Sequence, residues 1–177
     1  MRRAAVSLTL AALIVWTPAA AAVDEVRLSV KGLACAFCTY GIEKNLKKLP
    51  GVASVETTIK TGIVRLRLTP AATFDLVALQ QAVAKSGFTL SHIEATVTGR
   101  LTRHETHPAI DTDPPGQTFS LVGPVQGESS EPLSAVTLDK LTQASGDGSR
   151  RLTVSGRVHG HVQRPPSLSV ETFEVAK

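Results

Sequence analysis

Apolar residues in the first half of the chain alternate with polar ones and then repeat at helical spacing. The stretch EVRLSVKG alternates strictly, which predicts a half-buried strand. Its inward-facing residues are Val26, Leu28 and Val30. From Cys38 to Leu49 the apolar residues fall three or four positions apart, which predicts an amphipathic helix with lysines on its outer face. The sequence Leu49-Pro50-Gly51 is expected to end that helix.

The following segments complete a known arrangement of elements. Residues 52–68 predict two strands around a tight turn at 60–62. Residues 73–87 predict a second helix, which ends at a glycine, and residues 88–97 predict a further strand. The order β-α-β-β-α-β is the ferredoxin-like arrangement of the α+β class. Its antiparallel sheet would be covered on one face by both helices.

The second half of the chain predicts a small β-barrel. Short strand-like segments at 118–125, 150–160 and 165–176 surround a partly helical stretch around Leu138 to Leu141. A helix placed late among strands is similar to the OB-fold, whose helix lies between the third and fourth strands. A repeated pattern, V-T/S-G-R followed by Leu or Val, predicts two strands with a bulge-forming glycine. The repeat occupies Val97–Leu101 and Val154–Val158.

We expect three parts: a signal peptide at 1–22, a ferredoxin-like domain at 23–95 and an OB-like barrel at 96–177. The start of the chain has Arg2 and Arg3, an apolar run over 4–16 and then small residues, which is the order of a secretory signal. Cleavage after Ala20 or after Ala22 fits the preference for small residues at such a site. An uncleaved membrane anchor is the alternative. No linker separates the last two parts, so we expect them to touch. The signal pattern therefore predicts export to the periplasm, with no stable membrane insertion after cleavage.

Both cysteines of the chain, Cys35 and Cys38, fall in the loop between the first strand and the first helix. A helix N-terminus favours a thiolate, which is the form of cysteine that binds metal. No carboxylate or imidazole lies beside the pair, so the loop offers two soft sulfur donors. Such donors favour Cu(I) or Hg(II) over the ions that prefer oxygen, and Zn²⁺ usually requires four ligands.

Residues 26–90 resemble the heavy-metal-associated domain. The resemblance rests on GLACAFC (32–38), LKKLPGVASVE (46–56) and AVAKSGF (82–88). It implies that Cys35 and Cys38 are the metal ligands, with Leu33 in the place of the family's usual methionine. The family includes copper chaperones, modules of metal-pumping ATPases and the periplasmic mercuric-ion-binding protein. The resemblance therefore implies a non-enzymatic carrier of Cu(I) or Hg(II). Its partner would be a membrane metal transporter or another metal-binding domain.

Several side chains near the pair have two interpretations. Phe37 and Phe88 are expected to pack, and Tyr40 either covers the loop or packs. The lysines of the first helix are a solvated face or a docking surface for an acidic partner. These lysines are Lys44, Lys47 and Lys48.

Thiol–disulfide exchange is the main alternative, because C-x-x-C at a helix start is also a redox motif. The tryptophan usual before the first cysteine of that motif is absent, since Ala34 stands there. A structural disulfide would close a very small loop and stabilise the fold little. A third class is a partner-binding or envelope scaffold whose metal domain has lost its function.

Charge argues against a nucleic-acid partner. Without residues 1–22 the chain has 17 Lys and Arg against 15 Asp and Glu, a net charge of +2. Residues 23–95 contain 9 Lys and Arg against 6 Asp and Glu, and residues 96–177 contain 8 Lys and Arg against 9 Asp and Glu. Neither half has the positive field that nucleic-acid binding requires.

The histidines of the second half suggest a separate hypothesis. They are His104, His107, His159 and His161. If the first and fourth strands of the barrel pair, these imidazoles would converge on Zn²⁺ or Cu(II). Scattered surface histidines are the alternative.

Overall fold

The computed structural model describes residues 22–34, 36–105, 107–114, 116–126, 129–160 and 165–176. The expected signal peptide lies outside the described residues except for its last residue, Ala22. Within them, no helix has the length and apolar character needed to cross a membrane. The elements of the first half are β1 (Val23–Lys31), α1 (Ala36–Leu46), β2 (Val52–Thr58), β3 (Ile63–Leu68), α2 (Leu76–Lys85) and β4 (Thr89–His104).

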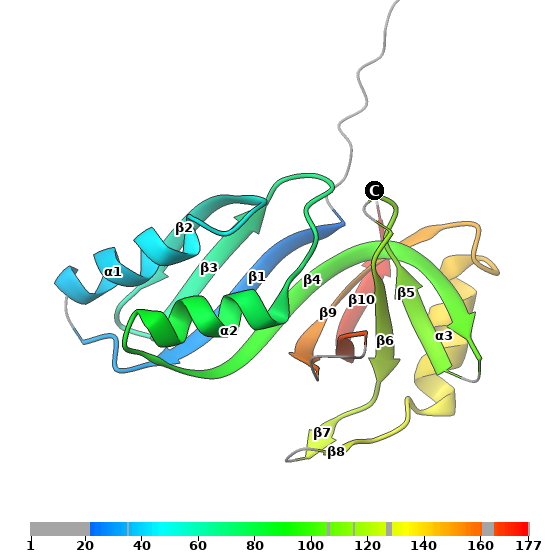
Figure 1. Cartoon of the computed structure of the whole chain (residues 1–177). Coiled ribbons are helices and arrows are strands. Elements are labelled where there is room, and N and C mark those ends of the chain that lie inside the picture. The colour runs from blue at the N-terminus through cyan, green and yellow to red at the C-terminus, as the bar shows by residue number, and fades with distance from the viewer. Residues whose placement is uncertain are drawn as a thin grey trace, which may run out of the picture.

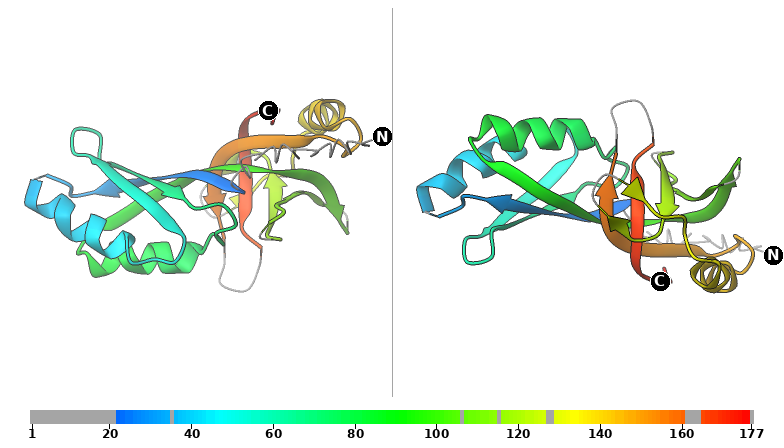
Figure 2. Two further views of the ribbon diagram at one scale, coloured as in Figure 1. Left: turned by 90° about the horizontal axis from the view of Figure 1, so that it is seen from above. Right: turned by 90° about the horizontal axis from the view of Figure 1, so that it is seen from below.

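The first half has the predicted ferredoxin-like order. Its strands lie in the order β2-β3-β1-β4, and β1 is antiparallel to both β3 and β4. Figures 1 and 2 show α1 and α2 side by side on one face of this sheet. The inward residues of β1 and the helices are buried, as predicted, among them Val26, Leu28, Ile42, Leu46 and Val83.

The helix α1 ends at Leu46, three residues before the predicted end. Leu49 still packs against the core, but it does so from the turn that follows the helix. The second helix matches its prediction more closely. The Asp75 side chain caps the start of α2 by accepting from the Ala78 N–H at 2.9 Å, and Gly87 follows its end with a φ of +82°.

The strand β4 is longer than predicted and serves both halves of the chain. Residues 89–97 pair with β1, residues 93–100 pair with β9 (Arg151–His159), and residues 100–104 pair with β5 (His107–Asp111). The expected boundary between residues 95 and 96 therefore lies inside a continuous strand. The expectation that the two halves touch is confirmed, and Figure 1 shows β4 curving from one half into the other.

The second half is a strand-rich barrel. It adds β6 (Thr118–Val122), α3 (Ala135–Ser145) and β10 (Ser167–Val175), with a small β7–β8 hairpin at Val125–Gln126 and Ser129–Ser130. The strands follow the order β4-β5-β6-β10-β9, and β9 pairs again with β4. The β6–β10 pairing is parallel, and α3 lies between β6 and β9 in the chain. The barrel core includes Phe119, Leu141, Leu152 and Leu168, all fully buried.

The repeated glycines do not form bulges, contrary to the prediction. The β4–β9 register is regular through Gly99 and Gly156, and the irregularity lies in β10, between Val170 and Thr172. Both glycines instead allow close approach of a neighbouring strand. A β-carbon at Gly156 would overlap the Ser169 carbonyl oxygen, and one at Gly99 would overlap the Asp111 carbonyl oxygen. The identity of the residue was informative, but its role depended on strand pairing that the sequence alone does not reveal.

Candidate metal centre

The candidate site is the loop that joins the end of β1 to the start of α1. The sheet fixes the end of β1, because the Val30 N–H donates to the Gly62 carbonyl at 2.8 Å and Lys31 pairs with Thr89. Cys35 lies outside the described residues. Cys38 lies in the first turn of α1, where its backbone alone is described. Cys38 is therefore part of the helix, and Cys35 precedes it in the sequence.

Three residues hold the loop against the core. Gly32 has a φ of +92°, a left-handed conformation that favours glycine. A β-carbon there would lie 3.7 Å from Cδ1 of Phe88, so this ring packs directly against the start of the loop. Leu33 is 7% exposed and belongs to the core cluster. The packing interpretation of Phe88 is confirmed, and the Leu33 side chain is also packed.

The other aromatic residues of the region do not pack. Phe37 is 94% exposed and Tyr40 is 69% exposed. Among the described side chains of α1, Ile42 and Leu46 are the buried ones, whereas Phe37 and Tyr40 are three residues apart on a different stripe of the helix. The packing interpretation of Phe37 is therefore wrong, and so is that of Tyr40. The Nζ of Lys44 lies 5.9 Å from the centre of the Tyr40 ring, which adds a cation to the same stripe.

The electrostatic setting of the loop favours an anion. The first turn of α1 has no acidic residue, so nothing opposes the partial positive charge of its unpaired N–H groups. At the other end of the helix, the Asn45 side chain donates to the hydroxyl of Ser86 at 2.9 Å, which ties α1 to the end of α2. The helix whose first turn includes Cys38 is thus fixed against α2.

The histidines do not converge, so the four-imidazole hypothesis is wrong. The β4 and β9 strands do pair, but their antiparallel register places residue 158 opposite residue 93 and residue 151 opposite residue 100. His159 therefore lies near the Thr89 end of β4, while His104 and His107 lie at its other end. His161 lies outside the described residues. Among the residues that are described, no group of three or more His, Cys, Asp and Glu side chains is arranged to hold a metal ion.

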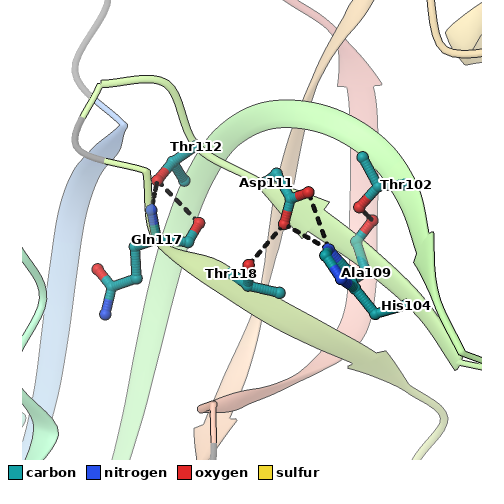
Figure 3. Close-up of polar contacts among 7 residues, drawn as sticks. All are labelled: Thr102, His104, Ala109, Asp111, Thr112, Gln117 and Thr118. Carbon is teal, nitrogen blue, oxygen red and sulfur yellow. Dashed lines mark hydrogen bonds and ion pairs between the residues drawn. The ribbon is translucent and has the colours of Figure 1, made fainter.

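One polar partner was not identified from the sequence. His104 contacts Asp111, with Nε2 lying 2.9 Å from Oδ2 and 3.1 Å from Oδ1 (Figure 3). Asp111 is seven residues away on the next strand, so the contact depends on the β4–β5 hairpin. The register places Arg100, and not His104, directly opposite Asp111, so strand pairing alone would not have identified this contact.

Comparison with known proteins identifies the first half of the chain. Residues 27–89 match the family model of the heavy-metal-associated domain. A 64-residue stretch is 34% identical to a copper-exporting P-type ATPase of Bacillus subtilis (strain 168). That stretch is 36% of this chain and only 8% of the ATPase, so the similarity concerns one small part of the transporter.

Two solved structures are similar to the same region. Oxidized MerP from Ralstonia metallidurans CH34 is 31% identical, and the alignment covers 40% of this chain and 96% of MerP with a TM-score of 0.36. The CopZ metallochaperone is 21% identical, and the alignment covers 38% of this chain and 98% of CopZ with a TM-score of 0.36. The assignment depends on the family match rather than on these superpositions. Residues 27–89 of the chain are a heavy-metal-associated domain.

Proposed function

We propose that this protein captures a soft heavy-metal ion, Cu(I) or Hg(II), through the thiolates of Cys35 and Cys38. It then delivers or sequesters the ion without catalytic turnover. The observation that carries this proposal is the match of residues 27–89 to the heavy-metal-associated domain, with the C-x-x-C pair at its β1–α1 loop. The similarity to a copper-exporting ATPase supports copper as one of these two metals.

The chemistry of the proposed site follows from its two donors. Thiolates are soft ligands, and a two-coordinate ion leaves room for a third thiolate. An incoming cysteine of a partner would bind the ion before one of the original thiolates leaves. Transfer by ligand exchange then requires that the loop lie at the surface. The exposure of Phe37, which lies between the cysteines, supports such access.

The partner we propose is a membrane metal transporter or another metal-binding domain. Phe37, Tyr40 and Lys44 form an exposed stripe that begins within the C-x-x-C loop. An aromatic stripe with a nearby cation suits a partner surface that is apolar and mildly acidic. Export to the periplasm through residues 1–22 belongs to the same proposal, as does the absence of enzymatic activity.

We also propose that residues 96–177 form an OB-like domain beside a metal domain at 23–95. Three features support this: the strand order β4-β5-β6-β10-β9, the parallel β6–β10 pair and the position of α3. A nucleic-acid ligand is not part of the proposal. Of the two aromatics in this half, Phe119 is fully buried, which leaves little for bases to stack on.

Metal titration of the reduced protein tests the function. We expect one equivalent of Cu(I) and of Hg(II) to bind in competition with a chelator, and a Cys35→Ser/Cys38→Ser variant to bind neither. Ser91→Ala, at an exposed position on β4, is the control and should bind as the parent does. Equal binding by the double cysteine variant would overturn the proposal. Turnover in an insulin-reduction assay, without metal retention, would instead establish the thiol–disulfide alternative.

A further inference from the structure

Two histidines lie at the tip of the β4–β5 hairpin. His104 and His107 are directly opposite one another in the antiparallel register and close a two-residue turn. The turn residue Glu105 has a φ of +56°, as tight hairpin turns require. Residues directly opposite on an antiparallel pair have β-carbons about 4.5–5.5 Å apart on the same face. Both histidines are exposed, so their rings can meet an ion from solvent.

The contact with Asp111 fixes which nitrogen of His104 is free. Both carboxylate oxygens of Asp111 lie within 3.1 Å of Nε2 (Figure 3). An ionised carboxylate can only accept hydrogen bonds, so the neutral imidazole carries its proton on Nε2 and a lone pair on Nδ1. Thr118 Oγ1 donates to Asp111 Oδ1 at 2.7 Å and holds the carboxylate in place.

This arrangement is the one that metal-ligating histidines adopt. A histidine that binds metal through one nitrogen almost always donates its other N–H to a carboxylate, a carbonyl or a water. Imidazole suits borderline ions, and among divalent first-row ions Cu(II) binds nitrogen ligands most tightly. We propose that His104 Nδ1 and a ring nitrogen of His107 bind a borderline divalent ion, best Cu(II), and that Asp111 is a positioning residue. Since no third protein ligand is found among the described residues, water would complete the coordination.

The proposed pair is distinct from the thiolate loop in place and in chemistry. Thr89, at one end of β4, pairs with Lys31 beside the C-x-x-C loop, and His104 is the other end of the same strand. A strand of 16 residues spans up to about 50 Å, less where it curves. The site therefore does not depend on the proposed capture of soft metals. Its test can be made in protein without cysteines.

The experiment is a Cu(II) titration of the Cys35→Ser/Cys38→Ser protein, followed by electron paramagnetic resonance and electron spin echo modulation. We expect one equivalent of Cu(II) to bind tightly, with two imidazole nitrogens coordinated to the ion. His107→Gln should lower the affinity at least tenfold and leave one imidazole in the spectrum. Asp111→Asn should lower the affinity about 10- to 100-fold, the range for loss of a carboxylate behind a ligating histidine. His92→Ala removes a histidine near the opposite end of β4 and should change neither result.

The spectra separate a metal site from a purely structural role of Asp111. His107 is exposed, so its replacement should leave the circular dichroism spectrum and the melting temperature without metal unchanged. A His104→Ala/His107→Gln protein that binds Cu(II) as tightly as its parent would overturn the proposal. Loss of one imidazole from the spectrum with His92→Ala, but not with His107→Gln, would overturn it equally.

Discussion

The backbone N–H of Thr98 donates a hydrogen bond to the carbonyl oxygen of Ala22 over 2.8 Å, which ties the residue before β1 to the middle of β4. Ala22 is 1% exposed and Thr98 is 3% exposed. The Thr98 hydroxyl also lies 2.9 Å from a carboxylate oxygen of Asp24, to which it donates. The chain that enters β1 is therefore part of the core that joins the two halves.

This contact predicts where the proposed signal peptide is cut. Cleavage after Ala22 would leave the Thr98 N–H without its acceptor and place a charged ammonium on Val23, which is 2% exposed. We therefore expect cleavage before Ala22, so that N-terminal sequencing of the exported protein gives a chain beginning at Ala21. A mature chain beginning at Val23 would contradict this. The protein that begins at Val23 should have a free energy of unfolding about 1–3 kcal/mol lower than the protein that begins at Ala21, because it lacks one buried hydrogen bond.

The two glycines Gly156 and Gly41 should respond to alanine with opposite signs. Gly156 is buried, and a β-carbon there would overlap the Ser169 carbonyl, so β9 or β10 must shift to admit it. We expect Gly156→Ala to lower the free energy of unfolding in urea by about 1–3 kcal/mol, as overpacking does. Gly41 lies inside α1, and in the described part of the chain no atom beyond the backbone of that helix lies within 4 Å of where its β-carbon would be. Gly41→Ala should raise the free energy of unfolding by about 0.5–1 kcal/mol. Equal effects of the two substitutions would refute the steric argument.

Local patterns allowed prediction of the first half of the fold but not of the junction. Alternation in β1 and helical spacing in α2 each depend on neighbours in sequence, so they are visible in the chain itself. The sharing of β4 by β1 and β9 depends on pairings over more than 50 residues, for which no local pattern exists. The role of Gly156 depends on the approach of β10, which no local pattern in the sequence reveals. The cysteine pair could be assigned from spacing and resemblance, whereas the exposure of Phe37 and the partner of His104 required the structure.

Asp111 makes the stability of the barrel depend on pH. Its pKa lies below the ordinary 3.8, because the hydrogen bonds it accepts outweigh burial, which raises it. A carboxylate with a lowered folded pKa stabilises the protein fully above pH 3.8, and this contribution is lost as the pH falls through the lowered value. We expect Asp111→Asn to cost about 1 kcal/mol at pH 7 in urea unfolding. The difference from the parent should shrink below pH 3.8.

The control for this prediction is Asp139, an exposed carboxylate on α3. Asp139→Asn should change the free energy of unfolding by less than about 0.5 kcal/mol at either pH. If Asp111→Asn left stability at pH 7 unchanged, or if its effect grew toward acid, the hydrogen bonds from Thr118 and His104 would not be the source of stabilisation.

The stripe of Phe37 and Tyr40 should matter for metal transfer and not for folding. Because these side chains are 94% and 69% exposed, replacing both by serine removes no core contact. We expect the Phe37→Ser/Tyr40→Ser variant to keep the parent's stability within about 0.5 kcal/mol and its affinity for Cu(I). Transfer of Cu(I) to the ATPase region similar to this chain should slow about five- to tenfold, since each 1.4 kcal/mol of lost docking energy is a factor of ten. Stopped-flow exchange measures that rate.

A matched substitution distinguishes docking from a general loss of surface hydrophobicity. Val136 on α3 is 65% exposed and lies in the barrel half, so Val136→Ser removes apolar surface far along the chain from the loop. This variant should transfer Cu(I) at the parent's rate. Exchange with a small thiol chelator, which needs no docking surface, should be the same in all three proteins. If the aromatic variant were slow with the small chelator as well, the two side chains would act on the thiolate loop itself and not on the partner, because the chelator meets only the metal and its ligands.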